Sequence, residues 1–256
     1  MTGNVAVRAP EPRFVDKAGA WIDLALTLPI FLAYHLGVVF MKTRNATDWL
    51  TDVLLRLADG DRAVYLGITG VLGLAFGTIF ALLGRGHAFA SRKFVQIALE
   101  GVVYAVLMRL GASYAVGQLL AGRVGSAATE GSVFDRVIMS MGAGFYEELA
   151  FRVVLFGLGA KFLVWILFRQ RVGIEGEVTI PKFTVRGFFV TLGWAIVVAF
   201  AFSGFHYVGV YGDEFKMASF LYRAFMGLAF AAIYVCRGFA AAVWTHALYD
   251  VWVLVF

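Results

Sequence analysis

The sequence predicts an all-α protein, a polytopic transmembrane helix bundle with about seven to eight spans. Of its 256 residues, 61% are hydrophobic and only 15% are charged, and the mean hydropathy is +0.81. A typical soluble domain is about 45–50% apolar and about 25% charged. The apolar residues are gathered in runs of roughly 20, the length that crosses a bilayer as a helix. These observations exclude an ordinary water-soluble globular protein.

The elements follow in order along the chain. Residues 1–20 are polar and contain Pro10 and Pro12, which predicts an N-terminal tail outside the membrane. The first apolar run, residues 21–41, exceeds the roughly 7–15 residues of a signal-peptide core, so we expect it to remain as an anchor. Further apolar runs cover residues 63–84, 95–120, 134–168, 186–206, 217–236 and 239–256.

Two segments leave alternatives open. Residues 49–57 have the pattern of an interfacial amphipathic helix, and residues 134–168 are long enough to contain a break or two helices. The longest clear loop, residues 169–182, is short, and no internal repeat is evident. We therefore expect a single transmembrane domain over residues 21–256.

The charges are typical of a membrane protein. Lys and Arg number 22 against 17 acidic residues, but they cluster at the ends of apolar runs, at residues 42–44, 92–93 and 169–171. Headgroup contacts and the positive-inside rule explain such clusters, and no basic stripe suggests a nucleic-acid partner. The single cysteine, Cys236, excludes an intrachain disulfide. The Arg-rich, Asn-poor composition favours a bacterial source, and hence the bacterial inner membrane.

Ionisable residues inside apolar runs are the first functional candidates, because each charge at the bilayer centre costs at least ~2.5 kcal/mol. The densest group is Glu147-Glu148-Leu149-Ala150-Phe151-Arg152. On an α-helix Glu148 and Arg152 share a face and can form an ion pair. Glu147 is turned about 100° away, so its carboxylate is free to act as a general base. The structural alternative is an interfacial salt-bridge cluster.

Two later segments place histidines in a similar setting. Phe202 and His206 are four residues apart, so the phenyl ring can pack against the imidazole. His246 and Asp250 have the same spacing in the last apolar run, where the carboxylate can accept a hydrogen bond from one ring nitrogen. The structural alternatives are an interfacial histidine for the first pair and a helix-locking hydrogen bond for the second.

The three motifs, in this order on separate apolar segments, resemble the type II CAAX prenyl protease family, also called CPBP, over roughly residues 95–256. The resemblance implies a helical bundle and a metal-independent glutamate endopeptidase without a cofactor. It implies that Glu147 and His206 activate a water, that His246 and Asp250 stabilise the oxyanion, and that Glu148, Arg152 and Phe202 support them. Because an ionised Asp has no proton to donate, Asp250 either donates when protonated or orients His246.

The implied partner is a membrane-associated protein or peptide, cut near its C-terminus or in a membrane-proximal segment. The candidates are a C-terminal tail, a sorting signal, a bacteriocin leader and a prenylated motif.

Other classes remain open. A zinc-dependent protease could use Glu147, His206, His246 and Asp250 as ligands, although no His-Glu-x-x-His motif occurs. A proton-coupled transporter would also place ionisable groups at membrane depth, but it predicts internal repeats. A non-catalytic membrane partner that binds tails or regulates signalling is the third alternative.

Overall fold

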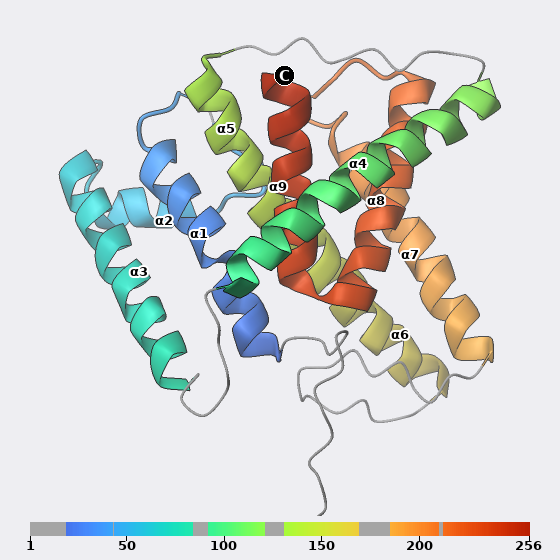
Figure 1. The fold of residues 1–256 in the computed structure, drawn as a ribbon, viewed down its shortest axis with the longest axis horizontal. Coiled ribbons are helices and arrows are strands. Elements are labelled where there is room, and N and C mark those ends of the chain that lie inside the picture. The colour runs from blue at the N-terminus through green and yellow to red at the C-terminus, as the bar shows by residue number, and fades with distance from the viewer. Residues whose placement is uncertain (1–18, 43, 84–91, 121–130, 169–184, 210–211) are drawn as a thin grey trace, which may run out of the picture.

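In the computed structural model, the described residues are 19–42, 44–83, 92–120, 131–168, 185–209 and 212–256, and their regular elements are all helical (Figure 1). The helices are α1 (Ala20–Val38), α2 (Leu50–Leu57), α3 (Arg62–Leu83), α4 (Arg92–Leu120), α5 (Val133–Gly142), η1 (Ala143–Glu147), η2 (Leu149–Leu158), α6 (Gly159–Phe168), α7 (Val185–Phe205), α8 (Met217–Arg237) and α9 (Phe239–Val255). The predicted tail over residues 1–18 and the loop and basic group over 169–182 lie outside the described residues. The all-α prediction is confirmed.

Six helical segments of the described chain are long and apolar enough to cross a membrane, and α9 is a shorter apolar helix. They coincide with the seven apolar runs of the sequence, so the chain is an integral multi-pass membrane protein. The segment predicted to be an amphipathic helix forms α2, in which Thr51 and Leu54 are buried, whereas Trp49 and Leu57 at its ends are exposed.

The long run after residue 132 is neither broken nor divided into two helices. It continues from Val133 to Leu167 as one span. Ser132 and Asp135 begin it with a capping box, in which each side chain accepts from the other residue's backbone N–H. The α-helix then passes into the π-helical segments η1 and η2, whose i→i+5 hydrogen bonds place more residues in each turn. Such π-helical turns are frequent at functional sites.

Helix α9 lies at the centre of the bundle, with α1, α4, α5 and α8 packed around it (Figure 1). After Phe239 the helix continues with three alanines and a valine, and Ala240, Ala241, Ala242 and Val243 are fully buried. Small residues let helix backbones approach closely in a membrane, where lipid is as apolar as the side chains. The α2 and α3 helices lie on one side of this centre and α6 and α7 on the other.

The N-terminus of α9 is held by a residue from α1. The Asp23 carboxylate accepts from the backbone N–H groups of Phe239 and, at 3.0 Å, Ala240. A carboxylate is stabilised there because the first N–H groups of a helix lack intrahelical partners and carry partial positive charge. Gly238 turns the chain from α8 into α9 with φ of +100°, and a Cβ there would lie 2.7 Å from Asp23 Oδ2. This junction fixes where α9 starts.

Gly144 sets the separation between η1 and α9. A Cβ on Gly144 would lie 2.7 Å from Ala247 Cβ and 2.8 Å from Val243 O. We expect Gly144→Ala to lower the free energy of unfolding by about 1–3 kcal/mol, because backbone atoms of α9 cannot yield as a side chain can. Thermal unfolding of the detergent-solubilised protein measures the effect. Gly111→Ala in α4 is the control: nothing lies within 4 Å of its added Cβ, so the melting temperature should hold or rise.

Candidate active site

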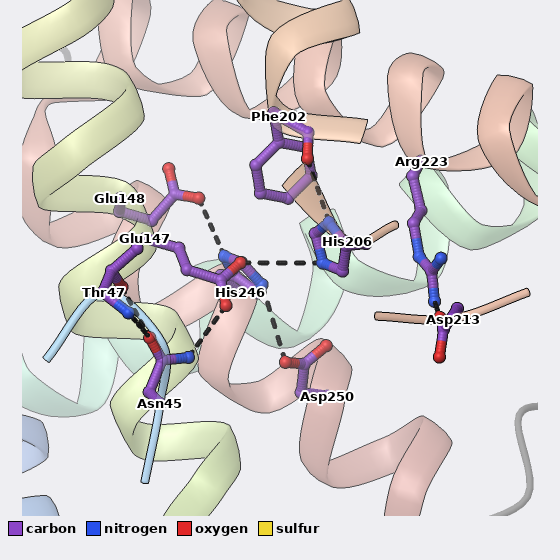
Figure 2. A network of polar contacts seen from close by, with 10 residues as sticks. All are labelled: Asn45, Thr47, Glu147, Glu148, Phe202, His206, Asp213, Arg223, His246 and Asp250. Atoms are coloured by element: carbon purple, nitrogen blue, oxygen red, sulfur yellow. Dashed lines mark hydrogen bonds and ion pairs between the residues drawn. The ribbon is translucent and has the colours of Figure 1, made fainter. Parts of the chain in front are cut away.

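The three sequence motifs meet at one place inside the bundle (Figure 2). Glu147 and Glu148 come from the π-helical region, His206 directly follows α7, and His246 and Asp250 lie on α9. The elements that carry these residues are far apart in sequence but pack against one another around the centre of the fold. Figure 2 shows the Glu147 and Glu148 carboxylates directed toward different histidines.

Glu148 is fully buried and is paired from two directions. Its Oε2 lies 3.1 Å from Arg152 Nε, which confirms the predicted contact between these residues. Its Oε1 accepts a hydrogen bond of 2.8 Å from His246 Nδ1. A buried carboxylate needs such compensation because removing it from water costs several kcal/mol. Glu148 therefore ties the π-helical segment to α9.

Arg152 is fully buried and lies among aromatic rings. Its guanidinium carbon is 4.4 Å from the ring centroid of Phe202 and 5.2 Å from that of Phe230. The faces of these rings attract a cation, the more so where water is excluded. Phe202 also packs against His206, with ring centroids 5.1 Å apart, as the four-residue spacing predicts.

Glu147 faces away from the Glu148 pair. Its Oε1 accepts from Asn45 Nδ2 at 2.8 Å, and its Oε2 lies 3.8 Å from His206 Nε2. Within the part of the chain that the structure describes, Oε2 is buried and forms no hydrogen bond. One oxygen of this carboxylate is thus held, while the other is directed toward an imidazole.

The orientation of His206 follows from its backbone contact. Nδ1 lies 2.9 Å from the carbonyl oxygen of Phe202, and because a carbonyl can only accept, Nδ1 carries the proton. In the neutral ring Nε2 is then the acceptor, and it faces Glu147. Burial lowers the pKa of His206, which lies just beyond the end of α7, and Glu147 opposes this effect only in part. The lowered pKa favours the neutral ring at physiological pH.

Both ring nitrogens of His246 face carboxylates. Nδ1 donates to Glu148 at 2.8 Å, and Nε2 lies 3.5 Å from Asp250 Oδ2. The shorter contact shows that Glu148 rather than Asp250 holds the ring, which the i,i+4 spacing alone did not indicate. Phe230 stacks on the same imidazole, with centroids 4.6 Å apart and planes 22° apart.

Sequence reasoning missed two residues of this site, Asn45 and Phe230. Asn45 lies between α1 and α2, and its partner Glu147 is 102 positions away, so no local pattern connects them. Phe230 is one of 25 phenylalanines and lies on an apolar helix where nothing distinguishes it. In both cases the tertiary packing is the only signal.

Among the described residues, no group of three or more His, Cys, Asp and Glu side chains is arranged to hold a metal ion.

The class of protein follows from comparison with known families, which places residues 129–252 among endopeptidases. Residues 129–252 match the family described as Type II CAAX prenyl endopeptidase Rce1-like, and this part of the chain belongs to that family. No match was found among curated proteins or solved structures.

The predicted resemblance is confirmed over residues 129–252, which form an endopeptidase-family domain in a chain with several candidate membrane spans. The match begins at residue 129, whereas the motifs indicated a start near residue 95. All seven residues proposed from the motifs lie inside the match. Asn45 and the helices α1 to α4 lie outside it, so the contact to Glu147 comes from a part of the chain that the family does not describe.

The buried ion pair leads to a stability prediction. Arg152→Met keeps much of the side-chain volume but leaves the Glu148 carboxylate without its cation, and we expect a loss of about 3–5 kcal/mol. Thermal unfolding and the folded yield in detergent measure it. The control is Lys216→Met, which removes an exposed pair to Glu214 at 3.7 Å and should cost about 0–1 kcal/mol. Equal stability of the two variants would contradict the structural role of Arg152.

Proposed function

We propose that this protein is a glutamate endopeptidase in which Glu147 and His206 activate a water for attack on a peptide carbonyl. The observation that carries the proposal is that two hydrogen-bond acceptors, Glu147 Oε2 and His206 Nε2, face each other in the site. Glu147 Oε2 is buried without a hydrogen bond to a described residue, and His206 Nε2 lies 3.8 Å from it. A water about 2.8 Å from both atoms can donate one hydrogen to each, which leaves a lone pair for attack.

The proton transfers follow from this geometry. Glu147 accepts a proton from the water as the hydroxide adds to the carbonyl carbon, and it returns that proton to the leaving amine when the carbon–nitrogen bond breaks. His206 accepts the second hydrogen bond and orients the water. The aromatic rings of Phe202 and Phe230 pack against His206 and His246, and such apolar surroundings strengthen the electrostatic contacts in the site.

His246 supplies the donor for the tetrahedral oxyanion. Glu148 holds Nδ1, so Nε2 of a doubly protonated ring is the N–H that remains to donate to the oxyanion. Asp250 lies beside Nε2 at 3.5 Å, where it stabilises the protonated ring or donates a proton of its own to the oxyanion. These roles complete the set that peptide hydrolysis needs: a water, a base and an oxyanion donor.

The substrate that we propose is a membrane-associated protein or peptide, cut near its C-terminus or in a membrane-proximal segment. The support is the position of the site, since Glu147 and Glu148 lie within the span Val133–Leu167 and both histidines lie beside it. The family name refers to CAAX prenyl substrates, and sorting signals, bacteriocin leaders and prenylated motifs all present such a segment.

The central test is the loss of the base. We expect Glu147→Gln and His206→Ala each to abolish cleavage while the protein stays inserted and folded, because they change the water-activating atoms and not the helix packing. Membrane proteomes of cells that express wild type or Glu147→Gln are compared for a protein whose C-terminal peptide persists only in the variant. Glu214→Gln, which removes a carboxylate with 86% side-chain exposure, is the control and should process normally.

This test also separates a peptidase from a catalytically silent member of the family. Full processing by folded Glu147→Gln would contradict the mechanism.

Asp250 provides a second test of the oxyanion site. Asp250→Ala removes the polar group beside His246 Nε2, and the loss of one oxyanion contact typically costs about 10²–10³ in rate. Asp250→Asn keeps an amide there that can both accept and donate, so its rate should fall by less. The processing rate of the accumulated precursor is the measurement, and wild-type activity in Asp250→Ala would leave Asp250 with a structural role only.

A further inference from the structure

Asn45 links the N-terminal part of the chain to the site. It lies in the segment between α1 and α2, is 8% exposed, and donates from Nδ2 to Glu147 Oε1 at 2.8 Å (Figure 2). The contact joins residues 102 positions apart, and Asn45 lies outside the family match over residues 129–252.

The amide of Asn45 is held in one orientation. Its Oδ1 accepts from the backbone N–H of Thr47 at 2.9 Å and from the Thr47 hydroxyl. Because only the carbonyl end can accept the backbone N–H, the NH₂ end must face Glu147. The backbone N–H of Asn45 donates in turn to the Tyr34 hydroxyl at 3.3 Å. Asn45 is therefore a preorganised donor whose direction does not depend on Glu147.

The residue before Glu147 is anchored to the same part of the chain. The Tyr146 hydroxyl lies 2.6 Å from His35 Nε2 on α1, and His35 Nδ1 lies 2.9 Å from the Tyr65 hydroxyl on α3. These groups are buried. Two consecutive residues of η1 are thus bound to polar groups from the first part of the chain, which fixes both the turn and the carboxylate that it carries.

We propose that Asn45 is the positioning residue of Glu147. By binding Oε1, it directs Oε2 toward His206 and reserves that oxygen for the proton of the water. This inference rests on the proposed function of Glu147. It means that the segment between α1 and α2 helps to orient the catalytic base.

The test compares two substitutions at position 45. Asn45→Ala removes the donor, and Asn45→Asp keeps the shape and the acceptor for Thr47 but removes the donor and adds a negative charge beside Glu147. We expect Asn45→Ala to slow processing about 10–100-fold, as for loss of a hydrogen bond to a charged group, and Asn45→Asp to slow it further. The readout is pulse–chase processing of the precursor that accumulates with Glu147→Gln, divided by the amount of folded protein.

Thr27→Val is the control. Thr27 is a buried residue of α1 whose hydroxyl donates to the Leu24 carbonyl and makes no contact with Glu147, so this variant should process at the wild-type rate. If Asn45 only held its own segment through Thr47, the order would be reversed, and Asn45→Asp would process faster than Asn45→Ala. That reversed order, or wild-type processing by Asn45→Ala, overturns the positioning role of Asn45. Loss of processing in Glu147→Gln would still support the proposed peptidase function. Normal processing by Glu147→Gln contradicts the proposed function itself.

Discussion

The structure depends on polar partners that offset the cost of burying two adjacent carboxylates on one membrane helix. Glu148 is fully buried and Glu147 is 8% exposed, and neither can remain charged in an apolar interior without polar partners. Consecutive residues of a helix point in different directions, so no single neighbour can serve both. Glu148 takes its partners from its own helix and from α9, and Glu147 takes its partners from the α1–α2 segment and from the end of α7. The bundle has to bring all of these elements together.

The same constraint separates the two carboxylates chemically. Glu148 is paired with a cation and a histidine, so its oxygens are engaged in holding Arg152 and His246. Glu147 has one oxygen held by a neutral amide and the other directed toward His206. A base needs an oxygen that is oriented but not neutralised by a cation. Of the two glutamates, Glu148 has its second oxygen beside Arg152, whereas Glu147 has its second oxygen beside His206. The two glutamate side chains are chemically identical, but they have different roles because their surroundings differ.

Close packing of small residues keeps these distances short. Gly144 precedes the two glutamates by about one turn and lies against Val243 and Ala247, which are close to His246 in sequence on α9. Asp23 holds the start of α9. A displacement of α9 by one side-chain width would separate His246 from Glu148. The polar contacts of the site therefore rely on an apolar contact in which one residue has no side chain, since only a glycine permits that approach.

The sequence by itself determined the all-α membrane class, the seven apolar helices, the Glu148–Arg152 contact and the family, because these depend on composition, run length and residues four apart. Tertiary structure alone decided that the run after residue 132 is continuous and π-helical, that Glu148 holds His246, and that Asn45 binds Glu147. Those contacts join residues about 100 positions apart, and their partners are selected by how helices pack. Hydrophobic patterning specifies which face of a helix is buried, but not which helix will cover it.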